Sequence, residues 1–278
     1  MTERAAVTVA FMGPRGTFSD IAVQAAFPGE KALECPTIPA VFDRVAAGAA
    51  TVGVVPIENS TEGGVSATLT ALLESSLSIC GELVIPVRLC LAARHEDRTR
   101  LRRVASHPQP LAQCRHWLER ELPGLELLST SSTTTGALEA QRDDATGAVT
   151  SHLGAELHQL FILAEDIQDS TENATRFVLV GSTDAARTGH DKTSLAFTTR
   201  HEQGALHEAL GVFDEAGINL TRIESRPAPG KRWEYVFVAD LEGHRTDPQV
   251  LGALEELRQR SSSVRVLGSY PRAAEEPD

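Results

Sequence analysis

The order of predicted strands and helices changes once along this 278-residue chain, and that change constrains the fold more than any other feature. Before residue 182, short apolar runs alternate with helical stretches, which predicts an α/β region with a mainly parallel sheet. After residue 191 the predicted order is strand, helix, strand, strand, helix, strand, which is typical of a ferredoxin-like unit. Between them, Ser182–Asp191 is polar and rich in small residues, so it is the predicted linker.

These patterns divide the chain into residues 1–182, a linker at 183–191, residues 192–271 and an acidic tail at 272–278. At roughly 150 residues per domain, the length agrees with about two domains. The first region carries two adjacent predicted strands, Ile79–Ile85 and Val87–Ala93, on either side of Pro86. We therefore expect this region to form two lobes.

Charge and composition exclude several classes of protein. With 26 Lys and Arg against 38 Asp and Glu, the formal net charge is −12, so a nucleic-acid-binding surface is not expected. No run approaches the roughly 20 apolar residues that span a bilayer, and the start of the chain has no secretory pattern, so we expect a cytoplasmic protein. The four Cys form no C-x-x-C pair and the nine His form no H-E-x-x-H, so no metal site is predicted.

Three loops at the ends of predicted strands combine small hydroxyl and amide groups with isolated charges: Gly13–Ser19, Pro56–Gly64 and Asn173–Phe177. In α/β sheets, ligands bind outside the carboxyl ends of strands, where helix N-termini offer free N–H groups to anions. The loops lack a dinucleotide fingerprint, a P-loop and a G-x-S-x-G nucleophile motif. Spacing alone leaves two interpretations open, an anion site or ordinary capped turns.

Several motifs, in order along the chain, carry a family resemblance. They are Gly13-Pro14-Arg15-Gly16-Thr17-Phe18-Ser19, Val55-Pro56-Ile57-Glu58-Asn59-Ser60, Ser106-His107-Pro108-Gln109-Pro110 with Gln113-Cys114, Asn173-Ala174-Thr175-Arg176-Phe177, Gly204-Ala205-Leu206 and Ile223-Glu224-Ser225-Arg226-Pro227. The first four resemble the motifs of prephenate dehydratase, and the last two resemble the phenylalanine-binding segments of its regulatory ACT domain. The resemblance runs from about Val7 to Tyr270.

This resemblance implies a bilobal catalytic domain, similar to periplasmic binding proteins, followed by a ferredoxin-like ACT domain. The implied reaction converts prephenate to phenylpyruvate with loss of water and carbon dioxide. Such an enzyme must protonate a departing hydroxyl and hold two carboxylates, so the resemblance implies neither a metal nor another cofactor.

The resemblance also implies roles for individual residues. Thr175 is the hydroxyl at the leaving group, and it needs a preorganised hydrogen-bond network because a free threonine hydroxyl is a poor acid. Arg176 is the expected carboxylate clamp, since guanidinium binds carboxylates bidentately. Asn59 and Gln113 supply neutral hydrogen bonds, and Glu58 orients them.

Further residues are expected to contact substrate. Thr17 and Ser19 are placed at the second carboxylate, and Ser106 and Phe177 are also placed among the substrate-binding residues. Because the substrate is a dianion, we expect this acidic chain to reverse its charge locally, at Arg176 and at the N–H groups of Gly13–Ser19. Simpler alternatives are a strand position for Thr175, a surface or capping carboxylate for Glu58, a turn role for His107 and a core position for Phe177.

For the ACT unit, the resemblance implies phenylalanine as the effector and a homodimer or homotetramer as the assembly. The expected effector residues are Gly204, Ala205, Leu206, Asn219, Glu224, Ser225 and Arg226.

Two positions depart from the family pattern: His152 stands where a carboxylate is common, and His207 where an apolar residue is common. His152 can alter substrate binding or simply face solvent, and His207 bears on the strength of feedback.

Rival functions keep the same scaffold. Arogenate is an alternative substrate, and decarboxylation of prephenate without loss of the hydroxyl is an alternative reaction. A non-catalytic amino-acid sensor is a rival of a different class. The intact pair Thr175 and Arg176 favours the dehydratase over the last two.

Overall fold

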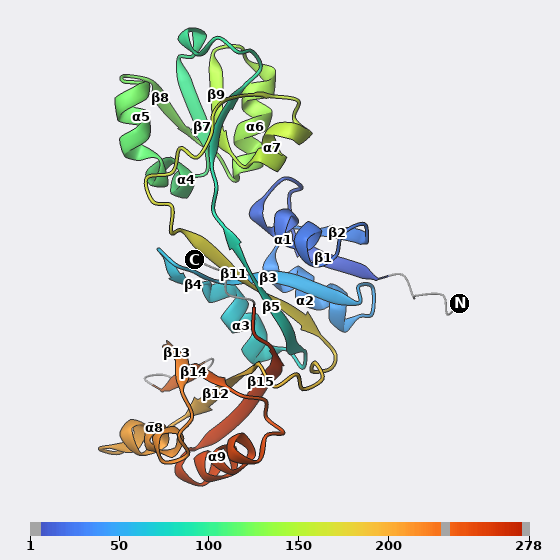
Figure 1. Ribbon diagram of the computed structural model, residues 1–278, viewed down its shortest axis with the longest axis vertical. Helices are drawn as coiled ribbons and strands as arrows, with labels where there is room; N and C mark the ends of the chain where they lie inside the picture. Colours follow the sequence, from blue (N-terminus) through green and yellow to red (C-terminus); the bar gives the residue numbers. More distant parts are fainter. Residues whose placement is uncertain (1–6, 229–233, 274–278) are drawn as a thin grey trace.

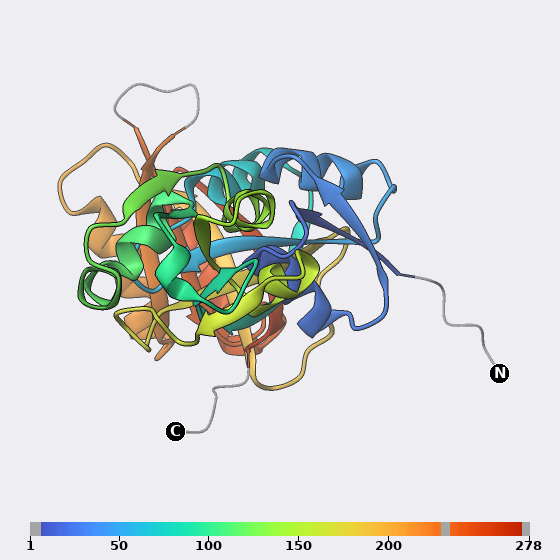
Figure 2. The same cartoon turned by 90° about the horizontal axis from the view of Figure 1, so that it is seen from above.

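The computed structural model describes residues 7–228 and 234–273, which form three sheets stacked along the long axis of the molecule (Figure 1). The first two sheets are the two expected lobes, and the third belongs to the C-terminal unit. Figure 2 looks along the same axis and shows the three parts lying over one another.

Lobe 1 is built on a sheet of order β2-β1-β3-β11-β5, with the short β4 paired to β3. Its elements are β1 (Thr8–Met12), α1 (Phe18–Ala26), β2 (Lys31–Cys35), α2 (Ile38–Ala46), β3 (Val52–Asn59), β4 (Gly63–Gly64), α3 (Ser66–Glu74), β5 (Ser78–Pro86) and β11 (Ala174–Gly181). β1, β2 and β3 are parallel, whereas β11 runs antiparallel between β3 and β5. β3 is apolar along most of its length because both faces of this sheet are covered.

Lobe 2 has a sheet of order β10-β6-β9-β7-β8. Its elements are β6 (Cys90–Ala93), the 3-10 helix η1 (Arg98–Arg100), β7 (Arg103–Ser106), α4 (Pro108–Gln113), α5 (Arg115–Glu121), β8 (Glu126–Ser129), α6 (Thr133–Arg142), β9 (Thr146–Thr150), α7 (His152–Leu157) and β10 (Phe161–Ala164). Two chain segments connect the lobes, and they bond to each other: Val87 N–H donates to Asn173 at 2.8 Å and Ile167 N–H donates to Leu89 at 2.9 Å. The lobes therefore meet at a paired crossing.

The C-terminal unit has the predicted βαββαβ order, with a four-stranded sheet of order β13-β14-β12-β15. Its elements are β12 (Asp191–Thr198), α8 (Ala205–Glu215), β13 (Leu220–Pro227), β14 (Tyr235–Glu242), α9 (Pro248–Arg260) and β15 (Ser263–Pro271). α8 and α9 cover one face of the sheet.

The other face of this sheet packs on lobe 1. Val236, Val238 and Leu267 belong to the same buried apolar cluster as residues of α2 and α3. The backbones come close where β15 crosses β5, because a Cβ atom added to Gly268 would lie 2.1 Å from the carbonyl oxygen of Ile79. The C-terminal unit is thus docked on lobe 1 through a continuous core.

Three details differ from the sequence predictions. β2 was not predicted, and β11 begins at Ala174, so that Thr175 lies within the strand instead of the preceding loop. The sequence pattern also predicts a single helix over residues 111–122, whereas the structure has two helices, α4 and α5, with a break at Cys114. The break has a long-range cause, because Asp169 accepts the N–H groups of His116 and Trp117 and caps the second helix.

Two predicted features fall partly outside the described residues. The sequence pattern predicts the third strand of the C-terminal unit over residues 233–241, but Trp233 lies outside the described residues, as do residues 274–278 of the predicted tail. Across the described ranges, no helix is both long enough and apolar enough to cross a membrane.

Candidate active site

A cavity of about 470 Å³ lies between the two lobes, at the carboxyl ends of their parallel strands. Its lining combines the three sequence loops with parts of lobe 2: Met12, Gly13, Pro14, Thr17, Phe18, Ser19, Pro36, Pro56, Asn59, Val87, His107, Gln109, Pro110, Gln113, Ser131, Ser132, Thr133, Thr175 and Phe177. A second hollow, against α4, α5 and β8, contains none of the predicted site residues.

Thr175 and Asn59 form the central polar pair of this cavity. They are direct partners across β11 and β3, and the Asn59 side-chain amide donates to Thr175 Oγ1 at 3.0 Å. The same amide also donates to Asn173 Oδ1 at 2.9 Å, while Asn59 Oδ1 accepts the N–H groups of Thr61 and Glu62. Asn59 is buried and its orientation is fixed by these bonds.

A β-bulge in β3 shapes the wall beside this pair. Arg176 pairs with Glu58, but Phe177 pairs with Pro56, so Ile57 is the extra residue on β3. Because strand side chains alternate between faces, Pro56 and Asn59 would otherwise point to opposite sides. The bulge brings both to the cavity, as bulges beside active sites commonly do.

Two helix N-termini face the cavity, one from each lobe. α1 begins after Thr17, and α6 begins after Ser132, whose hydroxyl accepts the N–H of Thr135. The first N–H groups of a helix lack partners within the helix, and the dipole favours negative charge there. The cavity can therefore accept two anionic groups, although none of the described residues that line it is Lys or Arg.

Arg176 does not contribute to this cavity, contrary to the expected clamp role. Consecutive strand residues point to opposite faces, and the Arg176 side chain lies on the face of β11 opposite Thr175 and Phe177. There it contacts Glu82, Asp240 and Tyr270. Glu58 also lies on that face, 3.5 Å from Arg176 and 3.3 Å from Arg222, and so does not orient Asn59 or Gln113.

The other predicted substrate residues divide in the same way. Thr17, Ser19, Gln113 and Phe177 line the cavity, and Phe177 is also a buried core residue. Ser106 does not line it: its fully buried hydroxyl donates to the carbonyl of Val149 at 2.6 Å. His152 is an exposed residue at the start of α7 and likewise does not line the cavity.

The expected effector residues lie on different faces of the C-terminal unit. Gly204 is the N-cap of α8 with a φ of +85°, a conformation that favours glycine, and Ala205 is buried behind it. Glu224 accepts from Arg222, and Arg226 donates to the Ser66 carbonyl of lobe 1 at 2.8 Å. Both therefore face lobe 1.

The remaining effector candidates are not brought together with Glu224. Ser225 and Asn219 are exposed, Leu206 packs into the core under the helices, and His207 is exposed on α8. Asn219 is five residues from Glu224, or roughly 16 Å along an extended strand. The two do not share one ammonium group within a single subunit.

Sequence reasoning missed Ser131, Ser132 and Thr133 as lining residues. The signal was present, since a Ser/Thr cluster follows a strand and opens a helix in the same way as residues 13–19. Only the position of lobe 2 over lobe 1 brings the two helix starts to one cavity.

The prephenate dehydratase family model matches residues 9–185, and the ACT domain model matches residues 194–259. The chain belongs to the prephenate dehydratase family. Its sequence is 45% identical over 269 residues to a bifunctional chorismate mutase/prephenate dehydratase of Aquifex aeolicus, covering 96% of this chain and 74% of that protein.

Two solved structures are similar over nearly the whole chain. One is the prephenate dehydratase of Arthrobacter aurescens in complex with L-Phe, with 39% identity and a TM-score of 0.89 over 98% of this chain and 92% of that one. The other is GqqA, described as a novel type of quorum quenching acylase, with 33% identity and a TM-score of 0.87 over 95% of this chain and 97% of that one. Of these two similar structures, one has phenylalanine bound and the other is described by a different activity.

Proposed function

We propose that this chain is a carbon–oxygen lyase that converts prephenate to phenylpyruvate, water and carbon dioxide in the cytoplasm, under feedback control by phenylalanine at its ACT domain. The observation that carries the proposal is the hydrogen bond from the Asn59 amide to Thr175 Oγ1 in the cavity between the lobes. The domain division at residues 1–182 and 192–271 is proposed with it.

The Asn59–Thr175 bond favours proton donation by Thr175. Because Thr175 Oγ1 accepts from Asn59, its own hydrogen is free to donate into the cavity. As the proton passes to the departing hydroxyl, negative charge develops on Oγ1, and the fixed amide donor stabilises it. The ring carbon–oxygen bond breaks, water leaves, and the electron pair of the breaking carboxylate bond completes the aromatic ring as carbon dioxide departs.

The two helix N-termini are the proposed carboxylate sites. Thr17 and Ser19 at α1 and Ser132 and Thr133 at α6 lie at the first N–H groups of the two helices, on opposite lobes. A substrate held by both would bring the lobes together around Thr175. Gln113, which also lines the cavity, supplies a further neutral hydrogen bond.

Amide hydrolysis is the second reaction to test, because of the likeness to GqqA. A serine nucleophile needs a hydrogen-bonded base. His107 Nδ1 instead accepts the N–H of Gln109, and no serine hydroxyl in the described part of the cavity is bonded to it. The geometry therefore favours dehydration.

The proposed assembly is a homodimer or homotetramer formed through the ACT domains. β15 is covered by lobe 1, whereas β13 is the other edge of the sheet and carries the half-exposed Ile223. Exposed edges of this kind are ready to pair with another chain. Light scattering of the purified protein, with and without phenylalanine, tests this part of the proposal.

The deciding experiment follows phenylpyruvate by its ultraviolet absorbance in base after incubation with prephenate. Parallel reactions with arogenate and an acyl amide test the rival activities, and added phenylalanine tests feedback. Phenylpyruvate formation from prephenate that phenylalanine suppresses is the expected result. Tight phenylalanine binding without any turnover would instead identify an amino-acid sensor.

A further inference from the structure

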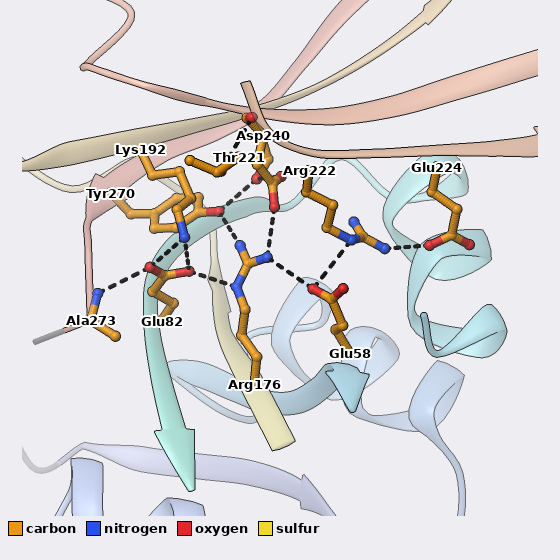
Figure 3. A network of polar contacts seen from close by, with 11 residues as sticks. Glu58, Glu82, Arg176, Lys192, Thr221, Arg222, Glu224, Asp240, Tyr270 and Ala273 are labelled. Atoms are coloured by element: carbon orange, nitrogen blue, oxygen red, sulfur yellow. Dashed lines mark hydrogen bonds and ion pairs between the residues drawn. The ribbon is translucent and has the colours of Figure 1, made fainter. Parts of the chain in front are cut away.

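A cluster of buried ionic and hydroxyl groups lies between lobe 1 and the ACT sheet (Figure 3). We call it the interface cluster, and it consists of Glu58, Glu82, Arg176, Lys192, Ser194, Arg222, Asp240 and Tyr270. The first three come from β3, β5 and β11 of lobe 1, and the others come from all four strands of the ACT sheet. None of them lines the cavity between the lobes.

Arg176 is the centre of the interface cluster. Its Nε donates to Glu82 at 2.7 Å, Nη1 to Asp240 at 2.6 Å and Nη2 to the Tyr270 hydroxyl at 3.0 Å. Only 12% of the side chain is exposed. Burial alone lowers the pKa of Arg176, but Asp240, Tyr270 and Glu82 together raise it, so the guanidinium stays charged.

The residues that the ACT sheet contributes to the interface cluster are also fixed by several hydrogen bonds. Asp240 is fully buried, and its second oxygen accepts from Ser194 at 2.6 Å, while Ser194 also contacts the Tyr270 hydroxyl at 2.6 Å. Lys192 donates to both oxygens of Glu82. A shift of the ACT sheet relative to lobe 1 must therefore carry Arg176 with it or leave buried charges unpaired, which is costly.

The position of Arg176 along β11 connects the interface cluster to the cavity between the lobes. Thr175 pairs with Asn59, and the next pair along the same two strands is Arg176 with Glu58. The first pair faces the cavity and the second faces the ACT sheet. One peptide unit therefore separates the proposed proton donor from the centre of the cluster.

We propose that Arg176 is a positioning residue through which the ACT domain sets the placement of the Thr175 hydroxyl. Arg176 takes no part in binding substrate, and it links Asp240 and Tyr270 to β11. This inference rests on the proposed function for its kinetic readout. If the ACT sheet can take two positions relative to lobe 1, a ligand that binds more tightly to one of them shifts the population toward that position. The shift moves Arg176, and with it Thr175, and so changes turnover.

A second set of contacts across the same interface offers a matched control. Arg265 of β15 donates to the carbonyls of Leu73 and Ser75 at the end of α3, so these bonds tie β15 to α3 and not to β11 or β3. If the cluster only attached the ACT domain, loss of Arg265 and loss of Asp240 would have the same kind of effect.

The experiment compares Asp240→Asn and Tyr270→Phe with Arg265→Gln in the full chain. The first two nearly keep the size of the side chain and remove one acceptor of Arg176. Tyr270→Phe is the variant that we expect to fold more readily, because it removes a neutral hydroxyl and not a buried charge. Each is assayed for kcat, KM for prephenate, phenylalanine inhibition, and phenylalanine affinity by calorimetry. We expect Asp240→Asn and Tyr270→Phe to lower kcat more than they change KM, and to weaken inhibition at least about fivefold while phenylalanine still binds. Arg265→Gln keeps the inhibition of the unaltered chain.

Hydrogen exchange of residues 174–181 provides a readout that does not need turnover. Phenylalanine is expected to change this exchange in the unaltered chain and in Arg265→Gln, but not in Asp240→Asn. If the unaltered chain fails to convert prephenate yet shows this pattern, the proposed function is wrong and the linkage stands. Unchanged inhibition in both cluster variants, or no effect of phenylalanine on residues 174–181, overturns the inference.

Discussion

The two faces of β11 carry opposite kinds of polar chemistry, although Thr175 and Arg176 are neighbours in the chain. The Thr175 face looks into a cavity of hydroxyls, amides and helix N-termini that has no cationic side chain among its described lining residues. The Arg176 face holds buried ions in direct contact with acidic groups of lobe 1 and the ACT domain. Arg176 and its buried acidic partners lie where domains meet, and not where the dianionic substrate is proposed to bind.

This difference suits the proposed reaction. One substrate carboxylate leaves as carbon dioxide, so its negative charge disperses toward the ring during the step. A buried cation bonded to that carboxylate would stabilise the bound substrate more than the transition state and slow turnover. Neutral donors at helix N-termini carry only a partial positive charge, so they hold the anion with a smaller penalty of this kind.

The sharpest test of the cavity face is Thr175→Ala. We expect kcat to fall by about 10²–10⁴-fold, the usual contribution of a positioned proton donor, while phenylalanine affinity is retained. Steady-state assays and calorimetry measure the two effects. Thr175→Ser keeps the hydroxyl and serves as the control, and unchanged turnover in Thr175→Ala would remove Thr175 from the mechanism.

The opposite face is tested by Arg176→Met, which removes the charge but keeps an unbranched apolar stem. Because it leaves Glu82 and Asp240 buried with one partner fewer, we expect the free energy of unfolding to fall by about 3–5 kcal/mol. Chemical denaturation measures this loss. Arg115→Met, at an exposed pair on α5, is expected to cost far less, because solvent screens exposed ion pairs. Equal losses in the two variants would contradict the contrast between the faces.

The contrast also explains which site residues could be predicted from the sequence. Asn59 and Thr175 follow from the family motifs, and the structure brings them together. Arg176 was misplaced because Asn173–Phe177 was expected to be a loop, where alternation of side chains does not apply. With the strand beginning at Ala174, Thr175 and Arg176 must point to opposite faces.

Long-range contacts set the remaining differences. The partners of Glu58 and Glu82 come from strands more than 90 residues away, and no local pattern indicates how the ACT sheet docks. The order of elements in the ACT unit, by contrast, was predictable because its helices and strands have clear hydrophobic periodicity and turn residues.

A smaller effect is expected at the N-terminus of α6. Ser132→Ala removes the hydroxyl that accepts from Thr135, and should cost about 1 kcal/mol of stability. It should also raise KM for prephenate, because the helix start lines the cavity. Thr37→Ala removes the equivalent cap of α2, which does not line the cavity, and should cost similar stability with unchanged KM. Equal KM values in the two variants would argue against a substrate site at α6.

The smallest predicted effect is a change in folding stability at low pH. Burial raises the pKa of Glu82, but Arg176 and Lys192 outweigh it and hold that pKa below its ordinary value. A lowered carboxyl pKa stabilises the folded state above the unfolded value of about 4.3 and ceases to do so as pH falls through the folded value. The stability difference between the unaltered chain and Glu82→Gln should therefore shrink below about pH 4.3. Glu119→Gln, at an exposed pair, is the control, and a difference that grows in acid would contradict the assignment.

The place of β11 in lobe 1 has a consequence for synthesis. This strand lies between β3 and β5, yet the chain reaches it only after all of lobe 2 has been made. While residues 87–173 emerge from the ribosome, β3 and β5 each have an unpaired edge, because β11 has not yet been made. Such edges are prone to pair with the wrong strand. Completion of lobe 1, arrival of the proposed proton donor and docking of the ACT domain all depend on the insertion of the same eight-residue strand.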